Sequence, residues 1–148
     1  LPSLSQVDQA ALIERYRVPV PRLILGADLG GLATACIDIS DGLVSDVGHI
    51  CAASSVGCTI DAASVPLSSA ATAVVSSDGL VLPTLLTGGD DYELAFAVRQ
   101  GAENDVIAIS EKVGVPVTRI GTFESGKGVK VFDQNGKAMA FTETGYKH

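Results

Sequence analysis

Residues 33–60 constrain the fold more than any other stretch of this 148-residue chain. Residues 33–39 and 58–60 are short apolar runs typical of strands. Between them, apolar side chains recur at helical spacing, at Leu43, Val44, Val47, Ile50 and Cys51. Ser40 is placed to cap the start of this helix, and Gly57 stands where a glycine commonly follows a helix end. The stretch therefore predicts a compact strand–helix–strand unit.

The remaining chain alternates between helical and strand patterns. Helices are expected over 5–17, 66–75 and 102–113, with Ser5 capping the first of them and Gly114 ending the last. A short helix or turn is expected over 23–32. Strands are expected over 92–98, 117–123 and 129–133, and the pair Asn135-Gly136 predicts a hairpin turn that leads to 138–141. Early alternation followed by a late meander favours the α/β class, with a mixed sheet covered by helices.

Composition narrows the possible functions. The net charge of −7 argues against a nucleic-acid surface, which needs clustered Lys and Arg. No apolar run reaches the roughly 18 residues of a membrane span. The 3 cysteines are odd in number and form no C-x-x-C pair, so we interpret them as small buried apolar groups. We therefore expect a protein of the reducing cytoplasm.

The first acidic motif is Asp38-Ile39-Ser40-Asp41-Gly42, between the first strand and the central helix. Asp38 and Ser40 are two residues apart at a strand end, so they should face one side, and Asp41 is expected to begin the helix. Carboxylates attract Mg²⁺, and the N–H groups of a helix start attract phosphate. The motif therefore favours a metal–phosphate site, and ordinary helix capping is the alternative.

The second acidic motif runs from Thr87 through Gly88, Gly89, Asp90, Asp91 and Tyr92 to Glu93. Paired glycines allow a backbone to approach a ligand closely, and crowded carboxylates need cations or donors to offset their repulsion. A solvated acidic turn is the alternative. His49 is interpreted as partly packed or solvated rather than catalytic, because no nucleophile is placed near it.

The two motifs together resemble a known family. Residues 35–43 are similar to the DxSDGL stretch of thiamine-monophosphate kinases, and residues 86–94 to that family's TGGEDYEL. Residues 45–50 continue the first likeness, and further likeness lies in 15–19, 117–121 and 145–148. The resemblance implies a three-layer α/β fold related to the C-terminal domain of aminoimidazole ribonucleotide synthetase. Residues 1–148 would form one C-terminal, substrate-side domain.

The resemblance also implies a reaction. The γ-phosphoryl group of ATP would pass to thiamine monophosphate, giving thiamine diphosphate, with several Mg²⁺ ions. Asp38 and Asp41 would be metal ligands, and Ser40 would contact the nucleotide phosphates. Asp90 would lie in the substrate pocket, with Asp91 nearby. No residue is assigned acid–base catalysis, because phosphoryl transfer depends on positioning and charge neutralisation.

Two departures from the family pattern matter. The family has Glu at the position of Asp90, and it carries an aromatic residue just beyond the position of His148. The N-terminal domain, which supplies most of the ATP site, most metal ligands and the dimer interface, is absent from these residues. We therefore expect the isolated chain to fold but to lack activity, and the full-length protein to be a homodimer.

Other functions remain open from the sequence. One alternative within the same fold is an ATP-dependent synthetase of the selenophosphate or purine-pathway type. Another is a binding module that takes a phosphorylated ligand without turning it over. A purely structural domain is the third.

Overall fold

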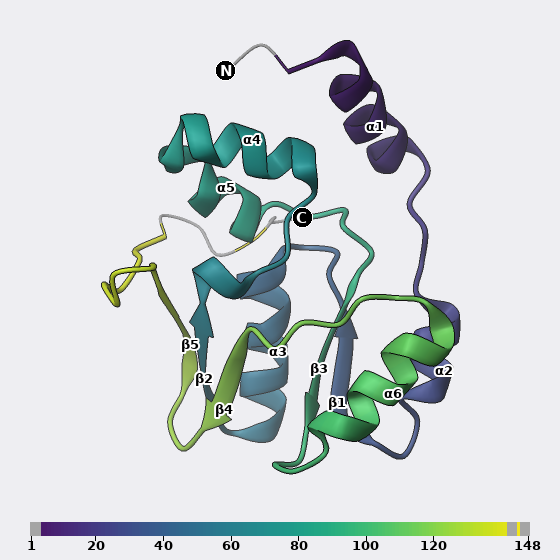
Figure 1. The fold of residues 1–148 in the computed structure, drawn as a ribbon. Coiled ribbons are helices and arrows are strands. Elements are labelled where there is room, and N and C mark those ends of the chain that lie inside the picture. The colour runs from purple at the N-terminus through teal and green to yellow at the C-terminus, as the bar shows by residue number, and fades with distance from the viewer. Residues whose placement is uncertain (1–3, 142–144, 146–148) are drawn as a thin grey trace.

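The computed structural model describes residues 4–141 and 145, arranged as two small sheets with helices around them (Figure 1). In the first sheet, β1 (Ala33–Asp38) pairs antiparallel with β3 (Leu94–Val98). The resemblance over 145–148 lies outside the described residues except for Gly145. The α/β class expected from the sequence is confirmed, with two sheets in place of one.

The second sheet has β2 (Gly57–Asp61) at its centre. One edge of β2 pairs antiparallel with β4 (Gly121–Glu124), and the other pairs parallel with β5 (Gly128–Phe132). The late strands therefore do not form the expected meander, because β2 lies between two of them. The third expected strand, 138–141, is reduced to a bridge between Phe132 and Ala138.

Helix α3 (Leu43–Ser54) connects the two sheets and contacts strands β1, β2 and β5 (Figure 1). Its apolar stripe is buried as the spacing predicted. The main core comprises Val44, Val47, Cys51, Cys58, Ile60, Ala62, Leu86 and Val131. The predicted strand–helix–strand unit is present, but its two strands belong to different sheets, because β4 and β5 occupy both edges of β2.

Two predicted ends of α3 are wrong. The residue before the helix is Gly42, not Ser40, and no side-chain cap is present there. At the other end, Ser55 takes the left-handed conformation, with φ of 55°. Gly57 instead begins β2, where a Cβ would lie 3.2 Å from the backbone nitrogen of Lys127. Glycine at this position therefore allows β2 to pack closely against the turn 125–127 between β4 and β5, and it does not end the helix.

The other helices pack around the sheets. They are α1 (Gln6–Arg17), α2 (Leu23–Asp28), α4 (Ser69–Ser77), α5 (Leu82–Thr87) and α6 (Glu103–Val113), with short 3₁₀ turns at Ala62–Ser64 and Gly79–Val81. Helices α2 and α6 lie together beside the first sheet, and α1 lies away from both sheets (Figure 1). No residue of α1 is buried. The predicted caps of two helices are confirmed, since the Ser5 hydroxyl accepts from Asp8 N at the start of α1 and left-handed Gly114 ends α6.

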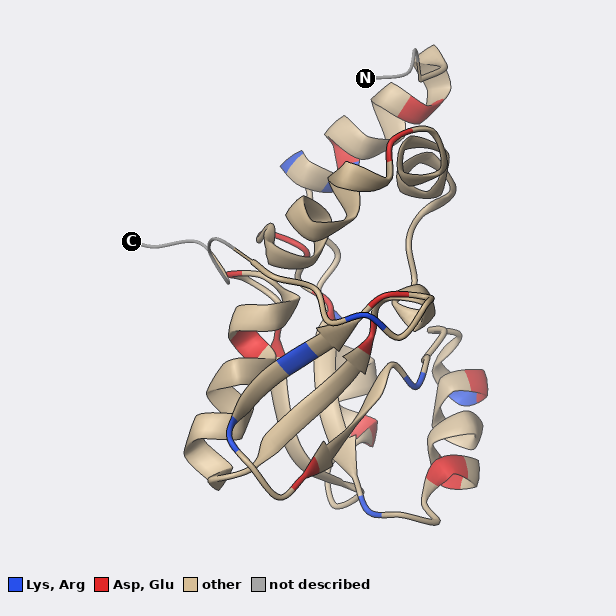
Figure 2. Ribbon diagram, turned by 90° about the vertical axis from the view of Figure 1, so that its left-hand side faces the viewer, with Lys and Arg blue, Asp and Glu red and all other residues tan. Residues whose placement is uncertain are grey.

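Lys and Arg are scattered over several elements of the described chain rather than gathered on one (Figure 2).

The three cysteines differ in burial. Cys51 and Cys58 are buried, as expected. Cys36 is exposed, because the side chains of β1 alternate between two environments and Cys36 falls on the open side. The prediction of a buried thiol is therefore wrong at Cys36.

Within the described residues, no single helix is long and apolar enough to cross a membrane. One pair of segments, Ser69–Ser77 and Gly79–Thr87, reaches that length and composition only across a bend of 117°.

Candidate functional site

The pairing of β1 with β3 brings the two acidic motifs together. Asp38, the last residue of β1, is opposite Leu94, the first residue of β3. Beyond the strands, backbone hydrogen bonds continue: Ile39 N donates to Glu93 O at 2.8 Å, and Tyr92 N donates to Ile39 O at 2.8 Å. Two motifs that are distant in the sequence therefore form one continuous surface.

Glycines allow the two loops to pack backbone against backbone. Asp90 N donates to Ser40 O at 2.9 Å. A Cβ at Gly42 would lie 2.6 Å from the carbonyl oxygen of Thr87, and a Cβ at Gly89 would overlap the carbonyl oxygen of Ser40. Gly42 also has φ of 121°, which side-chain-bearing residues rarely adopt. The paired loops therefore require glycine at both positions.

Asp46 organises the first loop from within α3. Its residue is only 2% exposed, and its Oδ2 accepts hydrogen bonds from the backbone N–H groups of Ser40, Asp41 and Gly42 at 3.0, 3.0 and 3.1 Å. The sequence suggested that these N–H groups point outward to a phosphate. They instead bond to Asp46, so the side chains and carbonyls of the loop are what remain for a ligand.

Sequence reasoning assigned no role to Asp46, although a signal was present. Asp46 lies three residues after Leu43 and four before Ile50, beside the apolar stripe of the helix. A carboxylate in that position is buried with the stripe, and buried charge requires several donors. The nearest donors are the N–H groups that precede the helix.

Asp41, Asp46 and His49 form a close group. Each offers one ligand atom, and these atoms all lie within 4.8 Å of one another. Asp41 is half-buried and His49 is exposed. His49 is solvated, which is one of the two environments expected for it. The sequence did not predict that its ring would lie near two carboxylates. Asp38 is not a member of this group.

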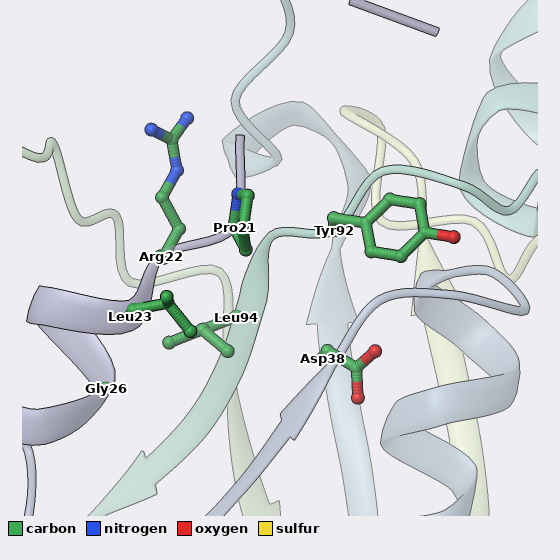
Figure 3. Close-up of a pocket in the computed structure, with 7 residues that line it drawn as sticks. All are labelled: Pro21, Arg22, Leu23, Gly26, Asp38, Tyr92 and Leu94. Carbon is green, nitrogen blue, oxygen red and sulfur yellow. The ribbon is translucent and has the colours of Figure 1, made fainter. Parts of the chain in front are cut away.

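Asp38 faces a neighbouring cavity of about 330 Å³ (Figure 3). Its lining residues come from α2, β1 and β3 and the segments next to them, and are Pro21, Arg22, Leu23, Gly26, Asp38, Tyr92 and Leu94. Asp38 and Tyr92 lie on one side, and the α2 residues lie on the other (Figure 3). The cavity is mainly apolar, with one carboxylate at its edge.

Glu93 anchors the second loop through two arginines. Arg22 forms a bidentate pair with it, from Nε to Oε2 at 2.7 Å and from Nη2 to Oε1 at 2.6 Å. Arg15 of α1 donates to Glu93 Oε1 at 2.6 Å and to the Asp91 carbonyl at 3.0 Å. The hydrogen bond with Glu93 raises the pKa of Arg22. The motif is therefore more than a solvated turn, since one of its three carboxylates is held between two cations.

Comparison with known proteins identifies the family. A protein-family model described as "AIR synthase related protein, C-terminal domain" matches residues 5–134. The chain belongs to this family.

This AIR synthase related domain is similar to thiamine-monophosphate kinases. It is 38% identical over 143 residues to the enzyme of Salmonella typhimurium, covering 97% of this chain and 44% of that protein. The crystal structure of thiamine-monophosphate kinase from Stenotrophomonas maltophilia K279a matches with a TM-score of 0.82 and 37% identity, over 92% of this chain and 42% of that one. The resemblance seen in the two motifs is thus confirmed.

A third match carries ligands. The structure described as "AaThiL complexed with AMPPCP and TMP" has a TM-score of 0.75 and 30% identity, over 99% of this chain and 43% of that one. The AIR synthase related domain thus spans less than half the length of the relatives it matches.

In this domain, Asp90 and Asp91 lie side by side on the second loop, and both residues are exposed. Asp90 takes the left-handed conformation, with φ of 68°, as does Tyr92, with φ of 53°. Local crowding by protein atoms raises the pKa of Asp91 to about 6, although the residue as a whole is exposed. The charge of Glu93 adds to this rise, Arg15 opposes it, and Asp90 adds slightly.

Asp91→Asn is expected to stabilise the domain at neutral pH. The folded state holds the Asp91 proton more tightly than the ordinary pKa of 3.8 allows, so ionisation lowers the stability as pH rises from about 4 through about 6. Asn carries no charge and so avoids this loss of stability, which amounts to about 1 kcal/mol of unfolding free energy after solvent screening, or about 3 °C in Tm. Thermal unfolding should show the gain at about pH 7.5 and no gain near pH 4. An equal gain at both pH values would contradict the assignment.

Proposed function

We propose that the chain is the substrate-side, C-terminal domain of a thiamine-monophosphate kinase, which transfers the γ-phosphoryl group of ATP to thiamine monophosphate. The main support is that the two acidic motifs lie together on one surface, joined by the hydrogen bond from Asp90 N to Ser40 O. The 38% identity to a thiamine-monophosphate kinase supports the choice of this reaction for that surface.

The donor set of the first loop fits Mg²⁺. The carboxylates of Asp38 and Asp41 are oxygen ligands of the kind this ion prefers. The N–H groups of the same loop are bonded to Asp46, so they neither repel a cation nor compete for its ligands. Bound Mg²⁺ would neutralise negative charge that accumulates on the phosphate oxygens.

Each residue of the site has a proposed role. Asp38 and Asp41 hold the cations, and the Ser40 hydroxyl contacts the nucleotide phosphates. Asp90 and Asp91 bind the substrate from the second loop. None of them needs to act as a general acid or base, because phosphoryl transfer depends mainly on alignment and electrostatic stabilisation. The interlocked loops suit that task, since they fix the two sets of side chains relative to each other.

The remaining half of the longer protein is the proposed main partner. Apolar side chains of α1 and α2 are open to solvent in this chain, with Tyr16, Leu23 and Ile24 exposed by 70%, 76% and 71%. A covering domain would remove this surface from water.

We also propose that the full-length protein is a homodimer in the cytoplasm, with no nucleic-acid or membrane partner. The net charge of −7 and the scattered cations support the exclusion of nucleic acid.

A direct assay tests the function. The longer parent protein should convert ATP and thiamine monophosphate to ADP and thiamine diphosphate in the presence of Mg²⁺. The isolated 148-residue chain should show no turnover, because part of the site cannot align the two phosphates and alignment contributes several kcal/mol. Phosphorylation of a different acceptor by the parent protein would contradict the proposed substrate. Turnover by the isolated chain would show that the other domain is dispensable.

A further inference from the structure

Three successive backbone N–H groups converge on one buried oxygen in this domain. Ser40, Asp41 and Gly42 all donate to Oδ2 of Asp46 within 3.1 Å. Successive N–H groups of this kind form a concave cradle that binds anions in many proteins. Here the anion is part of the chain itself, and its residue is 2% exposed, so solvent does not displace it.

The occupied cradle determines which charge the loop can accept. A phosphate oxygen would need the same N–H groups that already bond to Asp46, and it would also meet the carboxylate of Asp41, whose ligand atom lies within 4.8 Å of that of Asp46. Asp46 lies in the first turn of α3, where the helix dipole also favours a negative charge. With its donors occupied, the loop offers mainly acceptor oxygens to a ligand.

The same bonds fix the position of Asp41. Asp46 is part of a rigid helix whose neighbouring residues Val47 and Ile50 are buried. On its other side, the loop bonds through Ser40 O to Asp90 N and through Ile39 O to Tyr92 N. The loop is therefore held from the helix and from the second motif at once, and these bonds fix the backbone from which the Asp41 carboxylate extends.

We propose that Asp46 is a positioning residue that makes loop 40–42 selective for cations, by filling with its own carboxylate a cradle that would otherwise take an anion. This inference rests on the proposed function for the identity of the ligands, Mg²⁺ and phosphate. The preference of the loop for cations over anions does not depend on that function. It follows that phosphates approach this loop through a bound cation and the Ser40 hydroxyl rather than through its N–H groups.

Chemical rescue tests the proposal on the full 148-residue chain. Asp46→Ala removes the carboxylate and leaves a hole lined by three N–H donors, which formate can enter. Formate should raise the Tm of Asp46→Ala more than chloride does at the same ionic strength. Mn²⁺, followed by its electron paramagnetic resonance signal, should bind about tenfold more weakly to this variant and recover with formate. If Asp46→Ala is unfolded without formate, rescue is measured as the return of cooperative unfolding.

Two further variants control the experiment. Asp61→Ala removes another carboxylate that accepts a backbone N–H, from Ala63 at 3.0 Å, but this carboxylate is exposed and lies outside the loop. It should show no formate-specific rescue and unchanged Mn²⁺ affinity. Asp46→Asn keeps an oxygen that can accept these hydrogen bonds, so it should lose less Mn²⁺ affinity than Asp46→Ala and gain little from formate.

The outcomes separate this proposal from the kinase assignment. Formate rescue of both Tm and Mn²⁺ affinity supports the role of Asp46 whether or not the parent protein phosphorylates thiamine monophosphate. Equal effects of formate and chloride on Asp46→Ala would overturn it. Unchanged Mn²⁺ affinity in a folded Asp46→Ala would also overturn it, because the loop would then hold its ligands without Asp46.

Discussion

Asp41→Asn in the longer parent protein is expected to lower kcat about a hundredfold, while Tm changes by no more than about 2 °C. The loss reflects one negative charge removed from the proposed metal site, where a weakened ligand costs about 3 kcal/mol of transition-state stabilisation. Stability should change little because Gly42, not Asp41, is the residue before α3, and because the loop N–H groups bond to Asp46.

The measurement is kcat at saturating Mg²⁺ together with thermal unfolding of the same preparation. Asp78→Asn is a matched control, since Asp78 is an exposed aspartate whose carboxylate accepts from Leu80 N at 3.0 Å, outside both acidic motifs. It should leave kcat unchanged. Turnover of Asp41→Asn close to that of the unmodified protein would remove Asp41 from the proposed ligands.

Gly89→Ala is expected to cause a large loss of stability. The new Cβ would overlap the carbonyl oxygen of Ser40, and that oxygen is itself the acceptor of the bond from Asp90 N. Neither backbone can retreat without breaking the connection between the two motifs. We expect a loss of about 3 kcal/mol, equivalent to a fall of about 10 °C in Tm, and loss of activity in the parent protein.

Gly79→Ala provides the matched control. A Cβ added at Gly79 would meet no described atom within 4 Å, and Gly79 does not take the left-handed conformation. Its replacement should leave Tm unchanged or slightly raised, because alanine restricts the unfolded chain. Circular dichroism melting curves of the two variants test the comparison, and equal curves would show that the loops do not pack as closely as described.

The elements most accurately predicted from the sequence are those whose signals are local. Helix α1 begins at the predicted Ser5 cap, and α6 ends at Gly114 as expected. The apolar stripe of α3 is buried, and the turn at Asn135-Gly136 is present, with Gly136 at φ of 74° and Gly136 N bonded to Asp133 O. In each case a few neighbouring residues determine the conformation.

The errors arise where distant segments compete. Nothing near β2 in the sequence shows that β4 and β5 take both of its edges and thereby exclude β1 from its sheet. Likewise, Ser40 is a plausible helix cap until a buried carboxylate from the next turn takes the available N–H groups. The residues of the proposed site were found through motif resemblance. Their connection through Asp46 and Glu93 required the three-dimensional arrangement.

The exposed thiol on β1 offers a practical handle on this protein. Cys36 is exposed, while Cys51 and Cys58 are buried, so a maleimide dye should attach selectively to the first. Although Cys36 is exposed, nearby protein atoms displace some water from its thiol and raise its pKa, and the charge of Asp38 adds to this rise, so labelling should proceed faster in mildly alkaline buffer. A dye at this position sits two residues from Asp38 on the strand that leads into the first loop. Its fluorescence would then report in real time on anything that docks beside that strand.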